Sequence, residues 1–288
     1  MQVNYRWKKY YKTAKYPIRQ PRWLTWVIWT LSRICLIGKN YTLETIDMDG
    51  LEPPYIIFSN HMAFIDFELA AMVTYPKRVN NVVNIDGYHM MPWLLTWIGS
   101  ICTRKFTNDI HLVKSIRHVL KRGDVLAMYP EARYTPCGTL AFLPDSLGKL
   151  VRMNKVPVVA VVHRGNHLYA PFWDYKHKRK VPMHTTLKLI LTPEQIANMS
   201  VEEINAAGIN FYKERHAMPF STDDETDVLF VEDPYQPGCY HPRINGFETE
   251  SFKALPENER KAFYALHDNF YYHRHNDFWY GEAMKKLP

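Results

Sequence analysis

Cysteine is scarce in this 288-residue sequence, and several familiar metal-binding patterns do not occur in it. The four cysteines lie far apart and form no C-x-x-C pair, which argues against a zinc site or a disulfide framework and favours reduced thiols in a cytosolic compartment. No H-E-x-x-H pattern occurs either. His163 and His167 are four residues apart but lack a third ligand in the pattern, so we expect no metal site.

Acidic residues are missing from the first 43 positions, although the composition as a whole is ordinary for a globular protein. The net charge is +7 with histidine neutral. A basic balance suits an anionic partner such as a nucleic acid, an anionic membrane or a phosphorylated substrate. The basic residues that precede Glu44 are Arg6, Lys8, Lys9, Lys12, Lys15, Arg19, Arg22, Arg33 and Lys39.

A tryptophan-rich segment, residues 23–37, adjoins this basic run. It is too short for a membrane-spanning helix, which needs ~20 apolar residues, and a basic residue interrupts it. Trp23, Trp26 and Trp29 suit the headgroup level of a bilayer. We therefore predict that residues 1–38 form a basic, membrane-associating segment with an amphipathic helix. The alternative is a buried amphipathic helix of the globular domain, which would leave the acid-free flank unexplained.

Between residues 55 and 191, short apolar or β-branched runs alternate with stretches of helical pattern. This alternation predicts an α/β domain with a central, mostly parallel or mixed sheet that is flanked by helices. The predicted strands are Tyr55–Ser59, Val79–Val83, Ile101–Arg104, Val125–Tyr129, Val158–Val162 and Thr186–Leu191. The predicted helices lie near Asp66–Tyr75, Pro92–Ile98, Asp109–Lys121 and Leu147–Asn154.

Capping-box patterns that begin at Thr192 and Ser200 predict two short closing helices, which end near Lys213. Beyond about residue 217 the alternation stops, and an acidic stretch and several prolines follow. We therefore predict a folded domain over residues 39–217 and an atypical tail over residues 218–288.

The first candidate site is the stretch S-N-H-M-A-F-I-D at residues 59–66, between a predicted strand and a predicted helix. Residues five apart on a regular helix point ~140° away from each other, so His61 and Asp66 can meet only if His61 lies in the turn and Asp66 starts the helix. Asp66 could then hold one imidazole nitrogen and leave the other as a general base, as in a catalytic triad without its serine. An acyl thioester is already activated, so only the incoming alcohol would need deprotonation. The competing interpretation is a helix cap beside a surface histidine.

The second candidate site comprises charged residues at strand ends. The stretch Y-P-E-A-R at residues 129–133 follows one predicted strand, and Arg104 ends another. Arginines at the ends of parallel strands lie where open α/β sheets bind ligands, and guanidinium groups match phosphate geometry. The competing interpretation is a surface ion pair between Glu131 and Arg133 and a solvated Arg104.

Read in order, these stretches resemble the glycerolipid acyltransferase family, whose members acylate glycerol phosphate and lysophosphatidic acid. His61–Asp66 resembles that family's first motif, N-H-x-x-x-x-D, and Gly99–Arg104 resembles its second, a glycine followed by a phosphate-binding arginine. Tyr129–Arg133 resembles the third, F-P-E-G-T-R, and Val156–Val159 resembles the fourth, an apolar V-P-I-x segment. The resemblance covers roughly residues 46–213.

The resemblance implies a role for each residue. His61 would remove the proton from the substrate hydroxyl, and Asp66 would hold His61 in the right tautomer. Arg104 and Arg133 would bind the substrate phosphate, and Glu131 would help to position the glycerol part. The resemblance also implies a lysophospholipid acceptor, first of all 1-acyl-sn-glycerol 3-phosphate.

In the third motif this sequence departs from the family. Ala132 replaces the family's glycine, and the arginine falls one position early, at Arg133. The departure bears on the role of Arg133 and favours considering a lysophospholipid other than lysophosphatidic acid.

The resemblance further implies acyl-CoA or acyl carrier protein as the donor, no bound cofactor, and membrane lipids as partners. We expect a peripheral or monotopic protein on the cytoplasmic face of the cell membrane, acting in phospholipid biosynthesis. Nucleic acid is not an expected partner, because the basic run flanks an apolar helix and is not interleaved with aromatics on a groove.

Two other functions compete with acyl transfer. An esterase or phospholipase would use the same histidine and aspartate with a serine nucleophile, but the sequence contains no G-x-S-x-G elbow. A non-catalytic membrane- or lipid-binding protein would need only the basic, tryptophan-rich N-terminus.

The tail resembles a different family. Residues 234–243 and 271–288 are similar to an internal piece of a bacterial 4-α-glucanotransferase, over about sixty residues in all. The tail lacks that family's catalytic carboxylate motifs, so we assign it no glucan chemistry. We expect it to be poorly packed, or to lie loosely against the preceding domain. A natural fusion with a carbohydrate-binding role and a joining error in the source sequence are the alternatives.

Overall fold

The computed structural model describes most of the chain up to residue 216 and two short strands beyond that residue. Arg104 and Arg133 lie outside the described residues, as does the basic stretch before residue 16. The described residues are 16–63, 65–84, 88, 92–103, 109–131, 146–169, 180–216, 230–233 and 236–242.

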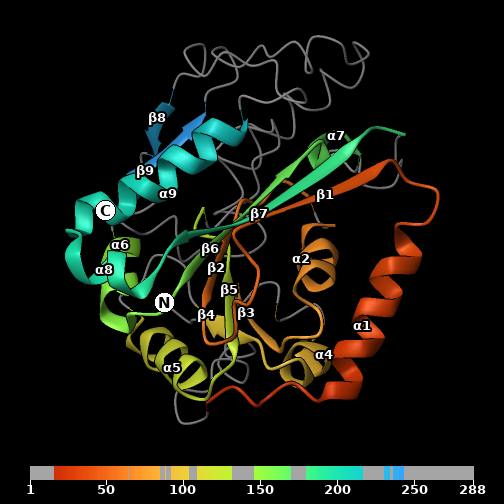
Figure 1. Ribbon diagram of the computed structural model, residues 1–288, viewed down its shortest axis with the longest axis horizontal. Helices are drawn as coiled ribbons and strands as arrows, with labels where there is room; N and C mark the ends of the chain where they lie inside the picture. Colours follow the sequence, from red (N-terminus) through yellow and green to blue (C-terminus); the bar gives the residue numbers. More distant parts are fainter. Residues whose placement is uncertain are drawn as a thin grey trace, which may run out of the picture.

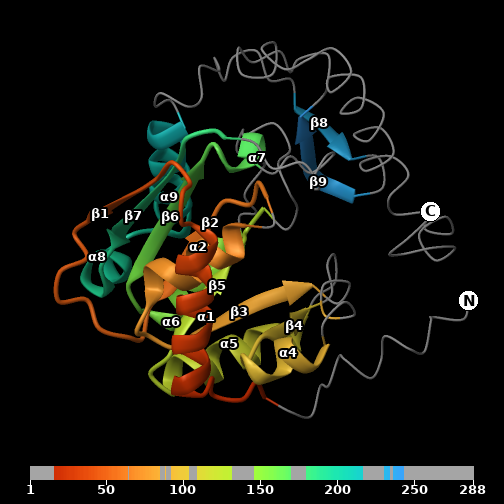
Figure 2. The ribbon, with the colours of Figure 1, turned by 90° about the vertical axis from the view of Figure 1, so that its right-hand side faces the viewer.

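A seven-stranded sheet forms the centre of the protein, with the order β1-β7-β6-β2-β5-β3-β4 (Figures 1 and 2). The five strands from β6 to β4 run parallel, whereas β7 pairs antiparallel with β6 and carries β1 parallel to itself. This mixed sheet confirms the predicted α/β class. The strands are β1 (Tyr41–Ile46), β2 (Ile56–Ser59), β3 (Val79–Asn84), β4 (Ile101–Thr103), β5 (Val125–Met128), β6 (Val158–Arg164) and β7 (Met183–Leu191).

Helices cover both faces of the sheet (Figure 1). Three of them lie on one side: α1 (Arg22–Cys35), α2 (Asp66–Thr74) and α4 (Pro92–Trp97). The helices on the other side are α5 (Ile110–Lys121), α6 (Ser146–Asn154), α8 (Pro193–Asn198) and α9 (Val201–His216). A single helical turn, α7 (Asn166–Tyr169), follows directly after β6.

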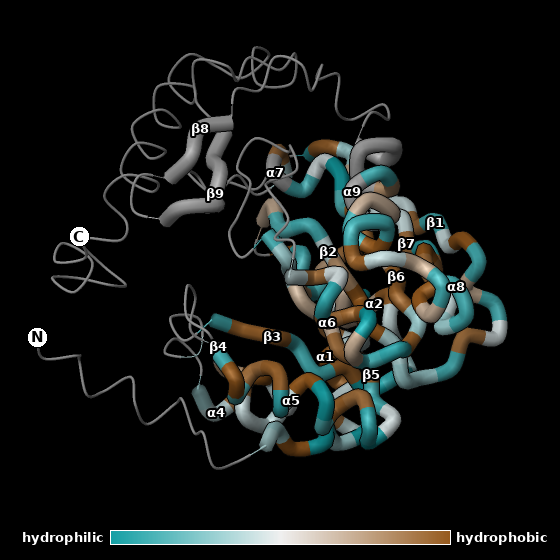
Figure 3. Tube along the Cα trace, turned by 90° about the vertical axis from the view of Figure 1, so that its left-hand side faces the viewer, coloured by the Kyte–Doolittle hydropathy of each residue, from teal (hydrophilic) through white to brown (hydrophobic). Residues whose placement is uncertain are grey.

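The two central strands, β2 and β6, are buried along their whole length. Their sequences are therefore near-continuous apolar runs, as a sheet covered on both faces requires. Ile56 and Phe58 pack toward α5, α6 and α9, whereas Ile57 packs into the core on the opposite face. Figure 3 shows hydrophobic and hydrophilic residues together in β3, whereas the surface helix α8 is largely hydrophilic.

All six predicted strands and all four predicted helices are present, with small shifts at their ends. Both capping boxes are also confirmed, since Thr192 and Ser200 exchange side-chain and backbone hydrogen bonds with the residues three positions on. The prediction of two short closing helices was wrong for the second, because α9 has 16 residues and continues to His216. Strand β1 was missed because it is a half-exposed edge strand without an apolar run.

The described part of the tail contains an antiparallel pair of strands, β8 (Phe230–Asp233) and β9 (Gln236–Pro242). The predicted boundary near residues 217–228 lies outside the described residues. The division at residue 217 and the loose packing of the tail therefore stay predictions.

Candidate active site

Three strands direct their carboxyl ends to one edge of the sheet. Strand β2 lies between β5 and β6 and is parallel to both. His61 follows the end of β2, Glu131 follows the end of β5, and β6 ends at Arg164. Segments that are far apart in sequence thus meet at the carboxyl edge of the sheet, where open α/β sheets bind ligands.

His61 and Asp66 are in contact, as the strand–turn–helix pattern predicted. Nδ1 of His61 lies 3.1 Å from Oδ2 of Asp66. Asp66 is the first residue of α2 and has no exposed surface, whereas the His61 side chain is 18% exposed. The Asp66 carboxylate can therefore orient the imidazole and leave Nε2 as the nitrogen that takes up a proton.

The role of Asp66 at the helix start differs from the expected N-cap. The N-cap position is Ile65, and no side chain caps the helix there. Oδ2 of Asp66 instead accepts hydrogen bonds from the backbone amides of Met62 and Ala63, at 2.6 and 2.9 Å. The carboxylate thus fixes the turn that contains His61.

Neighbouring side chains keep the Asp66 carboxylate charged although it is buried. Burial by itself raises the pKa of Asp66, but the hydrogen bond from His61 and the neighbouring polar groups outweigh it and hold the pKa below its ordinary value. Asp66 is therefore an anion at neutral pH, which is the state that stabilises a protonated His61.

A second group of buried polar residues supports the pair from β6 and α7, and the sequence did not reveal it. Nδ2 of Asn166 donates to Oδ1 of Asp66 at 2.7 Å. The Asn60 side chain makes two hydrogen bonds with the backbone of His163: it donates to the carbonyl oxygen at 2.9 Å and accepts from the amide at 2.8 Å. Asn166 lies 100 positions from Asp66, so no local spacing could have indicated the contact.

Glu131 and Tyr129 contact His61 from the end of β5. Oε1 of Glu131 accepts a hydrogen bond from the His61 backbone amide at 2.9 Å. The Tyr129 ring stacks on the imidazole, with ring centroids 4.1 Å apart. Glu131 is only 4% exposed, so its observed contact supports the position of His61. Its contact with the glycerol part of a substrate stays a prediction.

Comparison with known proteins agrees with the family resemblance that the sequence shows. A protein-family profile described as Acyltransferase matches residues 33–164, a range that contains His61, Asp66 and Glu131. The match therefore supports the resemblance to glycerolipid acyltransferases that the sequence motifs show. The structure is also similar to a crystal structure of the 1-acyl-sn-glycerophosphate (LPA) acyltransferase PlsC from Thermotoga maritima, with a TM-score of 0.52 and 16% identity. The similarity covers 68% of this chain and 80% of that one, and at this identity it supports the fold.

A second relative is similar to only a small part of the chain. The 4-alpha-glucanotransferase DPE2 from Oryza sativa subsp. japonica is 29% identical over 62 residues, which is 22% of this chain. The match spans 7% of that protein's own length. This is consistent with the glucanotransferase-like piece that the sequence suggested outside the acyltransferase domain.

The predicted phosphate ligands are Arg104 and Arg133. Strand β4 ends at Thr103, one residue before Arg104, and Arg133 follows Glu131 by two positions. Both arginines lie outside the described residues, so phosphate binding stays a prediction. Within the described part of the chain, no group of three or more His, Cys, Asp and Glu side chains is arranged to hold a metal ion.

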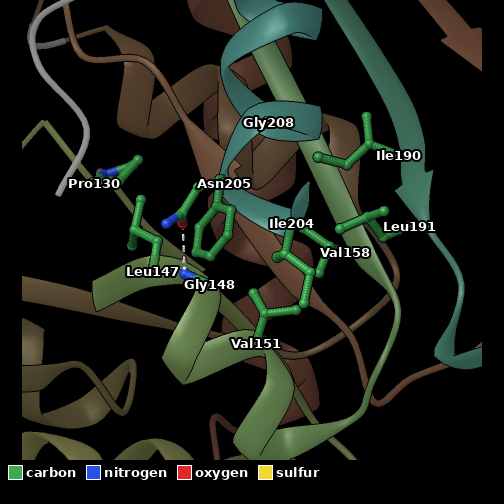
Figure 4. A pocket seen from close by; sticks show the side chains of 11 residues that line it. Pro130, Leu147, Gly148, Val151, Val158, Ile190, Leu191, Ile204, Asn205 and Gly208 are labelled. Carbon is green, nitrogen blue, oxygen red and sulfur yellow. Dashed lines mark hydrogen bonds between the residues drawn. The ribbon is translucent and has the colours of Figure 1, made fainter. Parts of the chain in front are cut away.

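A small apolar pocket lies on the face of the sheet that α6 and α9 cover (Figure 4). Phe58 of β2 and Pro130, the neighbour of Glu131, belong to its lining. Gly148 allows α6 and α9 to approach closely, because a Cβ there would lie 2.5 Å from a backbone oxygen of α9. At Gly208, in contrast, an added Cβ would meet nothing within 4 Å.

The protein also exposes several tryptophans on one surface. Trp23 and Trp26 of α1 and Trp93 and Trp97 of α4 are each more than half exposed, and we call these four residues the tryptophan surface. The two helices lie side by side (Figures 1 and 2), and the rings of Trp23 and Trp97 meet edge to face at 6.2 Å. None of the described helices has the length and apolar character to cross a membrane.

Proposed function

We propose that the protein transfers a fatty acyl group from acyl-CoA or acyl carrier protein to the free hydroxyl of a lysophospholipid. The first acceptor to consider is 1-acyl-sn-glycerol 3-phosphate, and phospholipid biosynthesis is the corresponding process. The observation that carries the proposal is the buried Asp66 carboxylate, held by backbone amides and bonded to a partly exposed His61 at the carboxyl edge of the sheet.

The chemistry follows from what this pair can do. Nε2 of His61 takes the proton of the acceptor hydroxyl as its oxygen attacks the thioester carbonyl carbon. The new C–O bond forms, the C–S bond breaks, and the protonated His61 returns the proton to the departing thiolate. Asp66 stabilises the imidazolium between these steps, so the ester and the free thiol are the only products.

Direct transfer is favoured over a covalent serine intermediate. Ser59 is the serine nearest to His61 in the motif, and it is 2% exposed. Its hydroxyl donates to the carbonyl oxygen of Asn60 at 3.1 Å, within the buried end of β2. A serine nucleophile must instead lie beside the base and reach the substrate.

For location we propose the cytoplasmic face of the cell membrane, with the tryptophan surface in contact with the lipid headgroups. Tryptophan is enriched at this level of a bilayer. Neither α1 nor α4 contains an acidic residue, and Arg22 and Arg33 of α1 are exposed beside the tryptophans. Such a combination of apolar and basic residues binds anionic lipid surfaces.

Acyl transfer should be tested with the full chain purified in detergent, labelled acyl-CoA and acyl carrier protein donors, and a panel of lysophospholipids. We expect a diacyl product, and we expect His61→Ala to reduce its formation by about 10²–10⁴ with little change in folding. The matched control is His184→Ala, in β7, a strand that is not adjacent to β2. Lipid binding without product would favour the non-catalytic alternative, and hydrolysis without transfer would favour a thioesterase.

A further inference from the structure

The second carboxylate oxygen of Asp66 is bound by a residue from a distant part of the chain. Oδ2 accepts from His61 and from two turn amides, whereas Oδ1 accepts from Nδ2 of Asn166 at 2.7 Å. Asp66 and Asn166 both have no exposed surface. Water does not reach Oδ1 in this environment, so the amide of Asn166 takes the place of its hydration.

The backbone fixes the position of Asn166. The preceding residue, Gly165, has a φ of +80°, and a Cβ at that position would lie 2.1 Å from the carbonyl oxygen of Pro182. The turn α7 closes with hydrogen bonds from Leu168 and Tyr169 to the Gly165 carbonyl, both at 3.0 Å. Tyr169 is buried against α2 and β7. The Asn166 side chain is therefore presented to Asp66 by a constrained turn.

The titratable groups that face Asp66 are His61 from the turn and His163 from β6. Burial lowers the pKa of His163 to about 4, so it is neutral at pH 7 and does not compete with His61 as the proton-binding partner. His163 also bonds through Nδ1 to Thr185 at 2.9 Å. Asn166 is thus the neutral donor on the remaining side of the carboxylate.

We propose that Asn166 is a positioning residue for acyl transfer, which holds Asp66 so that Oδ2 stays directed at His61. The inference rests on the proposed function and adds a residue that acts only through Asp66. Without this donor the carboxylate can tilt. With Oδ2 no longer held toward Nδ1, the Asp66–His61 pair binds a proton less tightly, and the imidazolium that acyl transfer requires is stabilised less.

The test is Asn166→Leu in the full chain, with kcat, KM and the pH profile of kcat/KM as readouts. A hydrogen bond to a charged group corresponds to a factor of about 10–100 in an equilibrium constant, so kcat should fall by that factor and the acidic limb of the pH profile should move down by about 1–2 pH units. The acceptor KM should change by less than about 3-fold, because Asn166 does not touch the substrate. The matched control is Asn80→Leu, since Asn80 is equally buried and donates to the Gly99 carbonyl at 2.6 Å. It should lower thermal stability and leave the pH profile in place.

An NMR titration of the His61 imidazole, in the wild-type chain and in both variants, separates this inference from the proposed function. A downward shift for Asn166→Leu alone supports positioning even if no acceptor is acylated, in which case the proposed function fails by itself. Equal titrations in the three proteins would overturn positioning and leave Asn166 a structural residue. If Asn166→Leu does not fold, Asn166→Ser, whose hydroxyl is too short to reach Oδ1, should show the same shift, and an unshifted titration there overturns the inference.

Discussion

Replacing Asp66 by asparagine removes one charge from the site and keeps the size of the side chain. The amide oxygen of Asp66→Asn can take the place of Oδ2 and keep the hydrogen bonds from His61, Met62 and Ala63. The NH2 group of the new side chain then faces the NH2 group of Asn166. The Asn166 amide can rotate so that its Oδ1 faces the new NH2 group, because that Oδ1 is buried without a hydrogen-bond partner. We therefore expect the variant to fold with the turn intact.

The loss of activity should be large, because the charge that stabilises the imidazolium is gone. Coulomb's law with an effective dielectric constant of about 20 gives about 5 kcal/mol for unit charges at the 3.1 Å separation of Nδ1 and Oδ2. This is an upper bound, since the His61 side chain is 18% exposed. A decrease in kcat of about 10²–10⁴, with an almost unchanged acceptor KM, is the corresponding expectation.

Stability should respond to pH in a defined direction. The pKa of Asp66 in the folded protein lies below its ordinary value of 3.8, so the stabilisation from its charged form is complete above that pH and is lost as the pH falls through the folded pKa. Urea unfolding of both proteins should therefore show a gap in unfolding free energy at neutral pH that narrows below pH 3.8. A kcat within about 5-fold of wild type would refute the assigned role of Asp66. A variant that does not fold at pH 7 would refute the expected rotation of the Asn166 amide.

Three further predictions concern regions around the active site. Arg104→Ala should raise the KM for a phosphorylated acceptor by about 10- to 100-fold, because that factor corresponds to the free energy of a charge-assisted hydrogen bond to phosphate. A change confined to the KM of the acyl donor would instead place Arg104 on the donor side. The double variant Trp93→Ser/Trp97→Ser should bind anionic vesicles less well than the wild type, even at high salt. The control Met153→Ser changes an exposed residue of α6 on the other side of the sheet and should not weaken binding. Equal binding by the wild type and both variants would exclude α4 from the lipid contact. A chain truncated after Ala217 should keep acyl transfer and lack any affinity for maltodextrin that the full chain has; an unfolded truncation would make the tail part of the enzyme.

The sequence predicted the central sheet because burial leaves a strong local signal there. Strands β2 and β6 are covered on both faces and must be apolar at every position. The contact of His61 with Asp66 was predictable for a similar reason, since five residues across a strand–turn–helix join leave only one arrangement in which the two side chains meet.

The support around this pair carries no such signal. Asn166 and His163 are polar residues at the end of an apolar strand, and their partners lie about a hundred positions away in the chain. Only the pairing of β6 with β2 brings these residues together, and a local pattern does not encode strand order. The positions of Arg104 and Arg133 stay predictions, because both fall on residues that are not described.

Helix α1 illustrates how one segment can satisfy two interpretations that the sequence set against each other. Leu24 and Ser32 are buried, and the helix packs against α2 and α4, as a helix of the globular domain should. Trp23 and Trp26 nevertheless remain exposed, and α4 adds two more tryptophans beside them. Deleting residues 1–38 would therefore remove core contacts as well as any lipid contact. Substitution of the exposed tryptophans alone separates membrane binding from folding, which is why the vesicle experiment changes α4 and leaves α1 in place.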